Sequence, residues 1–303
     1  MRVKPFLFLS ALALCTCIFS CGINDNEDLP DINHSFIQGN GLAEIFSKED
    51  FTALFPDSVF VEQGQYWTRI RNPFYTYEAF LEAASRFPKF CNEGNITLRK
   101  RELAAFLANT SHETTGGYPN APNGPYSWGY YFIREVGCFN ERTQMEQCPG
   151  YVDTSGVLGK RYRPAAGQQY YGRGPIQLSY NFNYGYFSDQ IGMGDRLLRE
   201  PDLLARDSVL SYMSAIWFWM TPQGNKPSCH NALIGRWEPT PADRKANRVP
   251  GFGITIDIIN GGIECGYGAN NEASNRIGFY QRFTEYFNIG KGDFCDCERM
   301  KPF

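Results

Sequence analysis

Helical periodicity is the feature that most constrains the fold of this chain. Apolar residues recur three and four positions apart in four segments, at about 76–87, 98–113, 207–220 and 272–287, and we expect each of them to form a helix. The third segment ends in Ala215–Met220, which is apolar on every side, and such a helix belongs in the interior of a domain. Alternating strand patterns are scarce. The sequence therefore predicts a mainly α protein.

The N-terminus has the pattern of an export signal. Two basic residues precede an uncharged stretch, 6–19, that is rich in Leu, Ala and Phe and too short for a comfortable membrane span. The stretch ends at a Ser-Cys pair that resembles a bacterial lipoprotein cleavage site, in which Cys21 would carry the lipid. We therefore expect residues 1–21 to be a signal peptide, of the lipoprotein type or of the plain secretory type. In either case the mature chain would act outside the cytoplasm, anchored at a bacterial outer membrane or cell surface, or secreted.

The rest of the chain divides into a tether and one domain. Residues 22–40 are polar and acidic, and we expect them to form a flexible tether. Residues 41–303 contain no internal repeat or low-complexity linker, so we expect a single domain that acts as a monomer. With 29 basic and 32 acidic residues, the chain lacks the charge footprint of a nucleic-acid-binding protein.

Cysteine usage agrees with export, because disulfides are common in exported proteins. Of the ten cysteines, the seven beyond Cys21 are Cys91, Cys138, Cys148, Cys229, Cys265, Cys295 and Cys297. Their pairing cannot be deduced from the sequence alone. No two CxxC motifs have a zinc spacing, and three histidines are too few for a His-rich metal site. The sequence therefore implies no metal and no cofactor.

Glu113 is the first candidate for chemistry. It lies at the end of the expected helix 98–113, among hydroxyls, glycines and His112. A carboxyl at the edge of an apolar core has a raised pKa because burial disfavours its charged form, and a general acid needs such a pKa to hold a proton near neutral pH. Taken alone, however, a Glu at a helix end is more often a surface residue.

Two further segments could complete a site for a polysaccharide. Glu135 follows the aromatic-rich run 126–132 and could supply a second carboxylate, or it could be a surface residue paired with Arg134. The segment 170–185 alternates aromatic, small and amide-bearing residues, with Arg173 as the exception in charge. Amides and hydroxyls can hydrogen-bond to sugar hydroxyl and acetamido groups, while aromatic faces stack on the ring. The aromatic content of 16% is compatible with this chemistry, although aromatic residues also build cores.

These motifs, in this order, resemble the glycoside hydrolase family 19 chitinases, the class best known from plants. The resemblance runs from about residue 41 to residue 298 and also includes Phe74–Phe80, Ala215–Met220, Gly251–Thr255 and Ile259–Cys265. It implies a mainly α, two-lobed, lysozyme-like fold with a long substrate cleft. It also implies an endo-acting chitinase that cuts the β-1,4 linkages of N-acetylglucosamine polymers, so the partner would be chitin or chitooligosaccharides.

The resemblance assigns roles to individual residues. Glu113 matches the family's general acid, Glu135 its general base, and Ser179 the residue that helps to hold the attacking water. The positions that match substrate-binding residues are Thr115, Trp128, Gln177, Asn183, Lys226, Asn260 and Arg276. His112 and Glu264 match supporting positions.

The implied mechanism is an inverting single displacement. It needs an acid on one side of the glycosidic bond and a base with a water on the opposite face, so the two carboxyl groups should stand roughly 6.5–9.5 Å apart. Glu113 and Glu135 lie on different segments, which can face each other across a cleft. We expect Arg276 to lie near Glu135 and keep it ionised, while the less solvated Glu113 stays protonated.

The chain departs from the plant pattern in places. Phe182 stands where a Tyr is usual, and Tyr131 replaces a common Cys, so one familiar disulfide is absent. Two other functions remain open: a peptidoglycan hydrolase of the same general fold, and a non-catalytic chitin-binding protein on an enzyme scaffold. The presence of both glutamates and Ser179 argues against the second of these.

The resemblance also suggests two disulfides. Cys138 and Cys148 are expected to pair with each other. Cys265 is expected to pair with Cys295 or Cys297.

Overall fold

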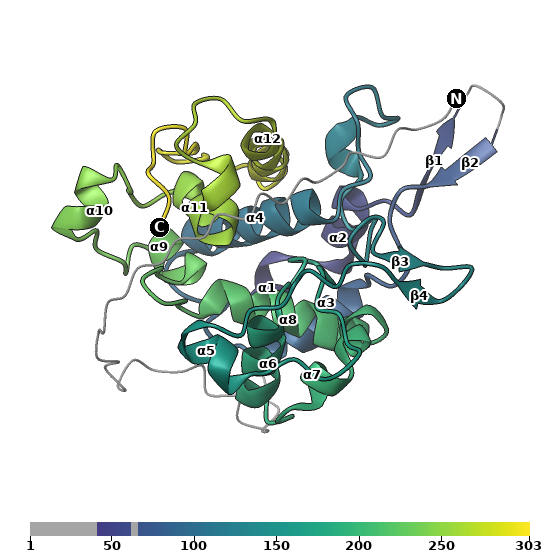
Figure 1. Cartoon of the computed structure of the whole chain (residues 1–303). Helices are drawn as coiled ribbons and strands as arrows, with labels where there is room; N and C mark the ends of the chain where they lie inside the picture. The colour runs from purple at the N-terminus through teal and green to yellow at the C-terminus, as the bar shows by residue number, and fades with distance from the viewer. Residues whose placement is uncertain (1–40, 62–65) are drawn as a thin grey trace.

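The computed structural model describes residues 41–61 and 66–303, and it is mainly α, as the sequence predicts (Figure 1). The expected signal peptide, with Cys21, and the tether 22–40 lie outside the described residues. The helices are α1 (Gly41–Ile45), α2 (Lys48–Leu54), α3 (Tyr77–Ser85), α4 (Ile96–Glu113), α5 (Gly156–Arg161), α6 (Asn181–Gln190), α7 (Arg196–Arg199), α8 (Ser208–Met220), α9 (Cys229–Ile234), α10 (Pro241–Lys245), α11 (Phe252–Glu264) and α12 (Asn271–Tyr286), with 3-10 turns η1 (Pro125–Ser127) and η2 (Pro201–Ala205).

Two short antiparallel hairpins complete the described secondary structure. β1 (Ser58–Val61) pairs with β2 (Tyr66–Arg69), and β3 (Phe139–Asn140) pairs with β4 (Met145–Glu146). None of the helices in the described part of the chain is both long enough and apolar enough to cross a membrane.

The four helices that periodicity predicts form as α3, α4, α8 and α12, with ends shifted by one or two residues. A polar side chain precedes each of them and accepts hydrogen bonds from backbone N–H groups of the first turn, which would otherwise lack partners. These capping residues are Thr76, Asn95, Asp207 and Asn270. The cap at Asn95 explains why α4 begins two residues earlier than the apolar pattern indicates.

α4 is the central helix of the molecule. Every residue from Glu102 to His112 is buried, so the helix is enclosed on all sides and not only along the apolar face. α11 and α12 pack against it from one side. On another side, the Phe106 ring lies 5.7 Å from Phe80 of α3 and 5.6 Å from Trp219 of α8, measured between ring centroids.

Most of the remaining helices form two lobes that meet at α4 and α9 (Figure 1). One lobe contains α10, α11 and α12, and the other contains α3 and α5 to α8, in which α3 packs on α8 and α6 on α7. The all-round apolar end of α8 is in the interior of the second lobe, where Trp217 and Trp219 are fully buried. α11 has a kink at Asn260, whose backbone angles (φ −144°, ψ 30°) are not helical.

Two disulfides fix loops of the structure. Cys138 is bonded to Cys148 around the β3–β4 hairpin, as expected. Cys265, directly after α11, is bonded to Cys297, and Cys295 is left as a free thiol.

Candidate active site

Glu113 ends α4 inside a buried network that is centred on one cation. The fully buried Arg276 of α12 donates hydrogen bonds to Glu113, to Asn109 and to both carboxylate oxygens of Glu264, at 2.8 and 2.7 Å. Glu264, at the end of α11, also accepts a hydrogen bond of 2.8 Å from the side chain of Asn260. Glu113 therefore shares its cation with a second carboxylate.

The two carboxylates of this network have different proton affinities. Burial raises the pKa of Glu113, and the opposite charge of Arg276 offsets this effect only in part. Burial also disfavours charge on Glu264, but Arg276 and the hydrogen bond from Asn260 hold the pKa of Glu264 below its usual range. Glu264 thus balances much of the charge of Arg276, and Glu113 can keep a proton. The Glu113 side chain is still 17% exposed, so it remains accessible from outside.

The residues on either side of Glu113 support its position. Burial, with Arg276 nearby, lowers the pKa of His112 to about 3, so this ring is neutral, and its Nδ1 lies 2.8 Å from Asn275 Oδ1. The Thr115 hydroxyl accepts a hydrogen bond of 2.9 Å from the Gly117 N–H. A Cβ on Gly117 would lie 2.3 Å from the Pro125 carbonyl oxygen, so the turn after α4 requires glycine at this position.

Glu135 lies beside the backbone of Gly172. The Glu135 N–H donates to the Gly172 carbonyl (2.9 Å), and the Gly172 N–H donates to Glu135 Oε2 (3.1 Å). The Tyr151 hydroxyl donates to Glu135 Oε1 at 2.6 Å. Both carboxylate oxygens are therefore held by neutral donors.

The expectation that Arg276 lies near Glu135 is wrong. Arg276 forms ion pairs with Glu113 and Glu264, and the ion pairs found between residues 41–61 and 66–303 include none with Glu135. The reason is the packing of α12 on α4, which brings Arg276 to the end of the helix that carries Glu113.

The segment after Gly172 joins three more of the predicted site residues to Glu135. Gln177 adopts a left-handed backbone conformation (φ 49°), and its side-chain amide donates to the Gly174 carbonyl at 2.9 Å. The Ser179 hydroxyl donates to the Gln177 carbonyl, and the Asn183 amide donates to the Ser179 carbonyl, each at 2.9 Å. The structure thus gathers these side chains on the segment that also binds Glu135.

The predicted substrate-binding residues Lys226 and Trp128 are both largely buried and hydrogen-bonded to backbone carbonyls. The Lys226 ammonium donates to the Ile258 carbonyl (2.8 Å), two residues before Asn260, and burial lowers its pKa. Trp128 is only 7% exposed, and its indole N–H donates to the Pro122 carbonyl at 2.9 Å. Most of the Trp128 ring is therefore used for packing, which leaves little of it for a ligand.

Two surface hollows border the predicted residues. The first, of about 430 Å³, lies beside Glu135 and is lined by Arg69, Asn72, Tyr131, Ile133 and Phe139 among others. The second, of about 370 Å³, lies beside Lys226 and is lined by Asn225, Asn231, Arg236 and Trp237 among others. Both combine aromatic and polar side chains, which suits a saccharide ligand.

The comparisons with known proteins identify the family. A family model described as chitinase class I, of glycoside hydrolase family 19, matches residues 57–297. The chain belongs to this family. Endochitinase 3 of Solanum tuberosum is 52% identical to this family 19 chitinase over 233 residues, which are 77% of this chain and 69% of that protein. Chitinase 2 of Oryza sativa subsp. japonica is 53% identical over 230 residues, 76% of this chain and 63% of that protein.

Solved structures of the family share the fold. Chitinase C from Streptomyces griseus HUT6037 superposes with a TM-score of 0.62 at 33% identity, over 88% of this chain and 99% of that one. The class IV chitinase from Zea mays gives a TM-score of 0.59 at 28% identity, over 85% of this chain and 100% of that one. The lysozyme-like, mainly α fold and the assignment to the glycoside hydrolases, as a family 19 endochitinase, are thereby confirmed.

Sequence reasoning missed two side chains of this family 19 chitinase that touch the predicted carboxylates or their cation. Tyr151 follows the Cys138–Cys148 loop and is one of 18 tyrosines, so nothing in its local pattern distinguishes it. Asn109 lies within the motif around Glu113, but its contact with Arg276 depends on how α12 packs.

Proposed function

We propose that this family 19 chitinase hydrolyses internal β-1,4 linkages of chitin or chitooligosaccharides by an inverting single displacement. Glu113 acts as the general acid and Glu135 as the general base. The observation that carries the proposal is the contrast between their surroundings: Glu113 has a raised pKa within a buried ion network, whereas Glu135 borders an open hollow and has neutral hydrogen-bond donors.

The surroundings of Glu113 suit an acid. Its pKa is raised by burial, and Glu264 takes up much of the charge of Arg276; both effects favour the protonated form of Glu113 that a general acid needs. During the reaction Glu113 gives this proton to the glycosidic oxygen as the bond from that oxygen to the anomeric carbon breaks. Arg276 then stabilises the carboxylate that is left.

The surroundings of Glu135 suit a base. Its two donors fix the carboxylate, and the same backbone at Gly172 leads to Ser179, whose hydroxyl can hold a water beside the base. The water attacks the anomeric carbon from the face opposite the leaving oxygen and loses a proton to Glu135. We assign the substrate-binding contacts to Thr115, Gln177, Asn183, Lys226 and Asn260, and we assign supporting roles to Trp128, His112, Glu264 and Arg276.

Digestion of chitin oligomers, followed by NMR that resolves product anomers, tests the mechanism. An inverting enzyme releases the α-anomer first from this β-linked substrate, and β-anomer as the early product would refute the proposal. Glu113→Gln and Glu135→Gln should each lower the rate by about 10²–10⁴-fold. Glu285→Gln is the matched control, because Glu285 is exposed on α12 and lines neither hollow; its rate should be unchanged.

The same preparation decides between the functions that the sequence leaves open. A wild-type rate on chitin oligomers no higher than that of Glu113→Gln would indicate a binding protein. Faster cleavage of cell-wall glycan than of chitin would indicate a peptidoglycan hydrolase.

We also propose that the enzyme acts outside the cytoplasm. The two disulfides support this location, because disulfides persist in oxidising compartments. We infer further that residues 1–21 are an export signal, that 22–40 are a tether, and that 41–303 are the catalytic domain, which acts as a monomer. The mass of the mature N-terminus tests whether Cys21 carries lipid, and the mass of the native protein in solution tests the monomer.

A further inference from the structure

A tyrosine outside the family motifs contacts the proposed general base. The Tyr151 hydroxyl donates to Glu135 Oε1 at 2.6 Å, while the Gly172 N–H donates to Oε2 at 3.1 Å. We propose that Tyr151 is a positioning residue, which fixes the orientation of the Glu135 carboxylate beside Ser179 and stabilises its ionised form. This inference rests on the proposed role of Glu135 as the base.

The phenol is a suitable partner for a base. Burial and the neighbouring carboxylate both raise the pKa of Tyr151, so the phenol keeps its proton and remains a donor throughout the working range. A neutral donor stabilises the ionised carboxylate less than a cation would, because it adds no net charge. Tyr151 and the Gly172 N–H therefore hold the carboxylate without placing a positive charge beside it. The arginine that would oppose proton transfer to Glu135, Arg276, is paired with Glu113 instead.

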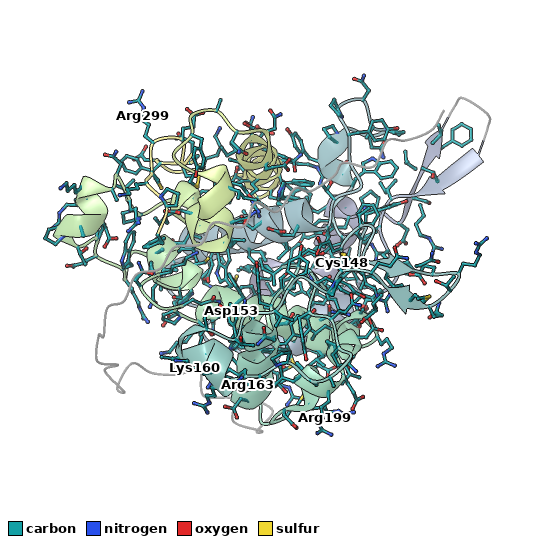
Figure 2. All side chains as sticks on the ribbon, viewed as in Figure 1. Cys148, Asp153, Lys160, Arg163, Arg199 and Arg299 are labelled. Carbon is teal, nitrogen blue, oxygen red and sulfur yellow. A yellow bond between two sulfur atoms is a disulfide. The ribbon has the colours of Figure 1, made fainter. Side chains whose placement is uncertain are left out.

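The backbone on both sides of Tyr151 is fixed. Before it, the Cys148 N–H donates to the Gln169 side chain at 2.6 Å, and Cys148 is bonded to Cys138. After it, the Asp153 N–H donates to the side chain of Asn181 at 2.7 Å, and Asn181 donates back to the Asp153 carbonyl at 2.9 Å. Figure 2 labels Cys148 and Asp153, which lie in the middle of the molecule in that view.

The same anchor also holds the segment of Ser179. Asn181 is fully buried and lies two residues after Ser179, at the start of α6. The Tyr151 ring packs edge-on against Tyr180, between these two residues, at 5.4 Å between ring centroids. Tyr151 thus contacts both Glu135 and the segment that carries Ser179. These contacts can keep the base and the residue that would hold the water in fixed relative positions.

Tyr151→Phe tests the inference, because it removes the hydroxyl and keeps the ring. Loss of a hydrogen bond to a charged group changes an equilibrium constant by about 10- to 100-fold. We expect kcat/KM to fall about 10- to 100-fold through kcat, with KM little changed. The acid limb of the pH profile, where the base becomes protonated, should move up by about one pH unit. Thermal unfolding should be unchanged within a few degrees.

Tyr162→Phe is the matched control. The Tyr162 hydroxyl also donates to a carboxylate, that of Asp189, at 2.8 Å, and it makes no contact with Glu135. This variant loses the same kind of hydrogen bond, so its kcat and its pH profile should equal those of the wild type. A similar loss in both variants would indicate a general structural effect and would overturn the proposal.

A double variant separates action through Glu135 from direct contact with the sugar. If Tyr151 acts through the carboxylate, adding Tyr151→Phe to Glu135→Gln causes no further loss, because the two changes act on one interaction. A further loss in the double variant, or a slower Tyr151→Phe enzyme with an unmoved pH profile, overturns the positioning role.

The single variants distinguish the two proposals. An active Glu135→Gln enzyme refutes the role of Glu135 as base, and the Tyr151 proposal falls with it. An inactive Glu135→Gln enzyme together with a Tyr151→Phe enzyme of wild-type rate and pH profile refutes only the role of Tyr151.

Discussion

Glu264→Gln should lower the pH at which the proposed general acid loses its proton. Glu264 is 1% exposed and accepts two hydrogen bonds from Arg276. Glutamine keeps the size of the side chain but removes its negative charge. Arg276 would then face Glu113 as its remaining carboxylate in this network, so it would stabilise the ionised form of Glu113, which cannot donate a proton.

The size of the effect follows from the geometry of the network. An opposite charge at contact distance lowers a carboxyl pKa by about 1–3 units. Arg276 already touches Glu113, and only the compensating charge of Glu264 is lost, so we expect the basic limb of the pH profile to move down by about one unit. Breaking a buried ion pair costs about 3–5 kcal/mol. Because Glu113 still pairs with Arg276, the cost should be near the lower value, which lowers Tm by about 6–12 °C.

The assay is the pH dependence of kcat/KM on a soluble chitin oligomer, for folded protein well below its Tm. Glu285→Gln is the control: Glu285 lies on α12 with Arg276, is exposed, and accepts a hydrogen bond of 2.8 Å from Gln281. This variant loses the same charge and should keep the wild-type profile. A folded Glu264→Gln enzyme whose basic limb stays in place, or moves to higher pH, would refute the charge-sharing argument.

Two other predictions concern stability. The His230 ring lies 2.6 Å from Glu102 and 2.8 Å from Glu93. Burial opposes the charge of this ring, but the two carboxylates raise its pKa above the value in the unfolded chain. Protonated His230 therefore stabilises the fold fully below about pH 6.5, and this contribution is lost as the pH rises through the pKa of the folded protein. Thermal unfolding between pH 5 and 9 should show this loss in the wild type and not in His230→Gln, and parallel curves would contradict it. Cys265→Ser should cost about 3–4 kcal/mol and Cys148→Ser about 2–3 kcal/mol in the loop-entropy model, because the bridges span separations of 32 and 10 residues; urea unfolding measures both, and the reverse order would contradict the model.

The sequence by itself determined the elements that depend on nearby residues. α3, α4, α8 and α12 form where apolar spacing predicts them, because a helix is specified by side chains three and four positions apart and by a cap next to its first turn. The disulfide between Cys138 and Cys148, which flank one hairpin, was expected from the family resemblance and not from the sequence pattern alone. The family motifs around Glu113 and Glu135 were likewise visible without coordinates, and they indicated a chitinase.

Only the tertiary structure decided which side chains contact Glu113 and which contact Glu135. Arg276 and Glu113 are 163 residues apart, and their contact depends on α12 packing against α4, so the sequence could place Arg276 in the site but not beside the right glutamate. Tyr151 reaches Glu135 because Asn181 and a disulfide fix the ends of its loop. The spacing of nearby residues cannot predict such contacts, because charges and hydrogen-bond donors in a buried site act over a few ångströms of space, whatever their separation along the chain.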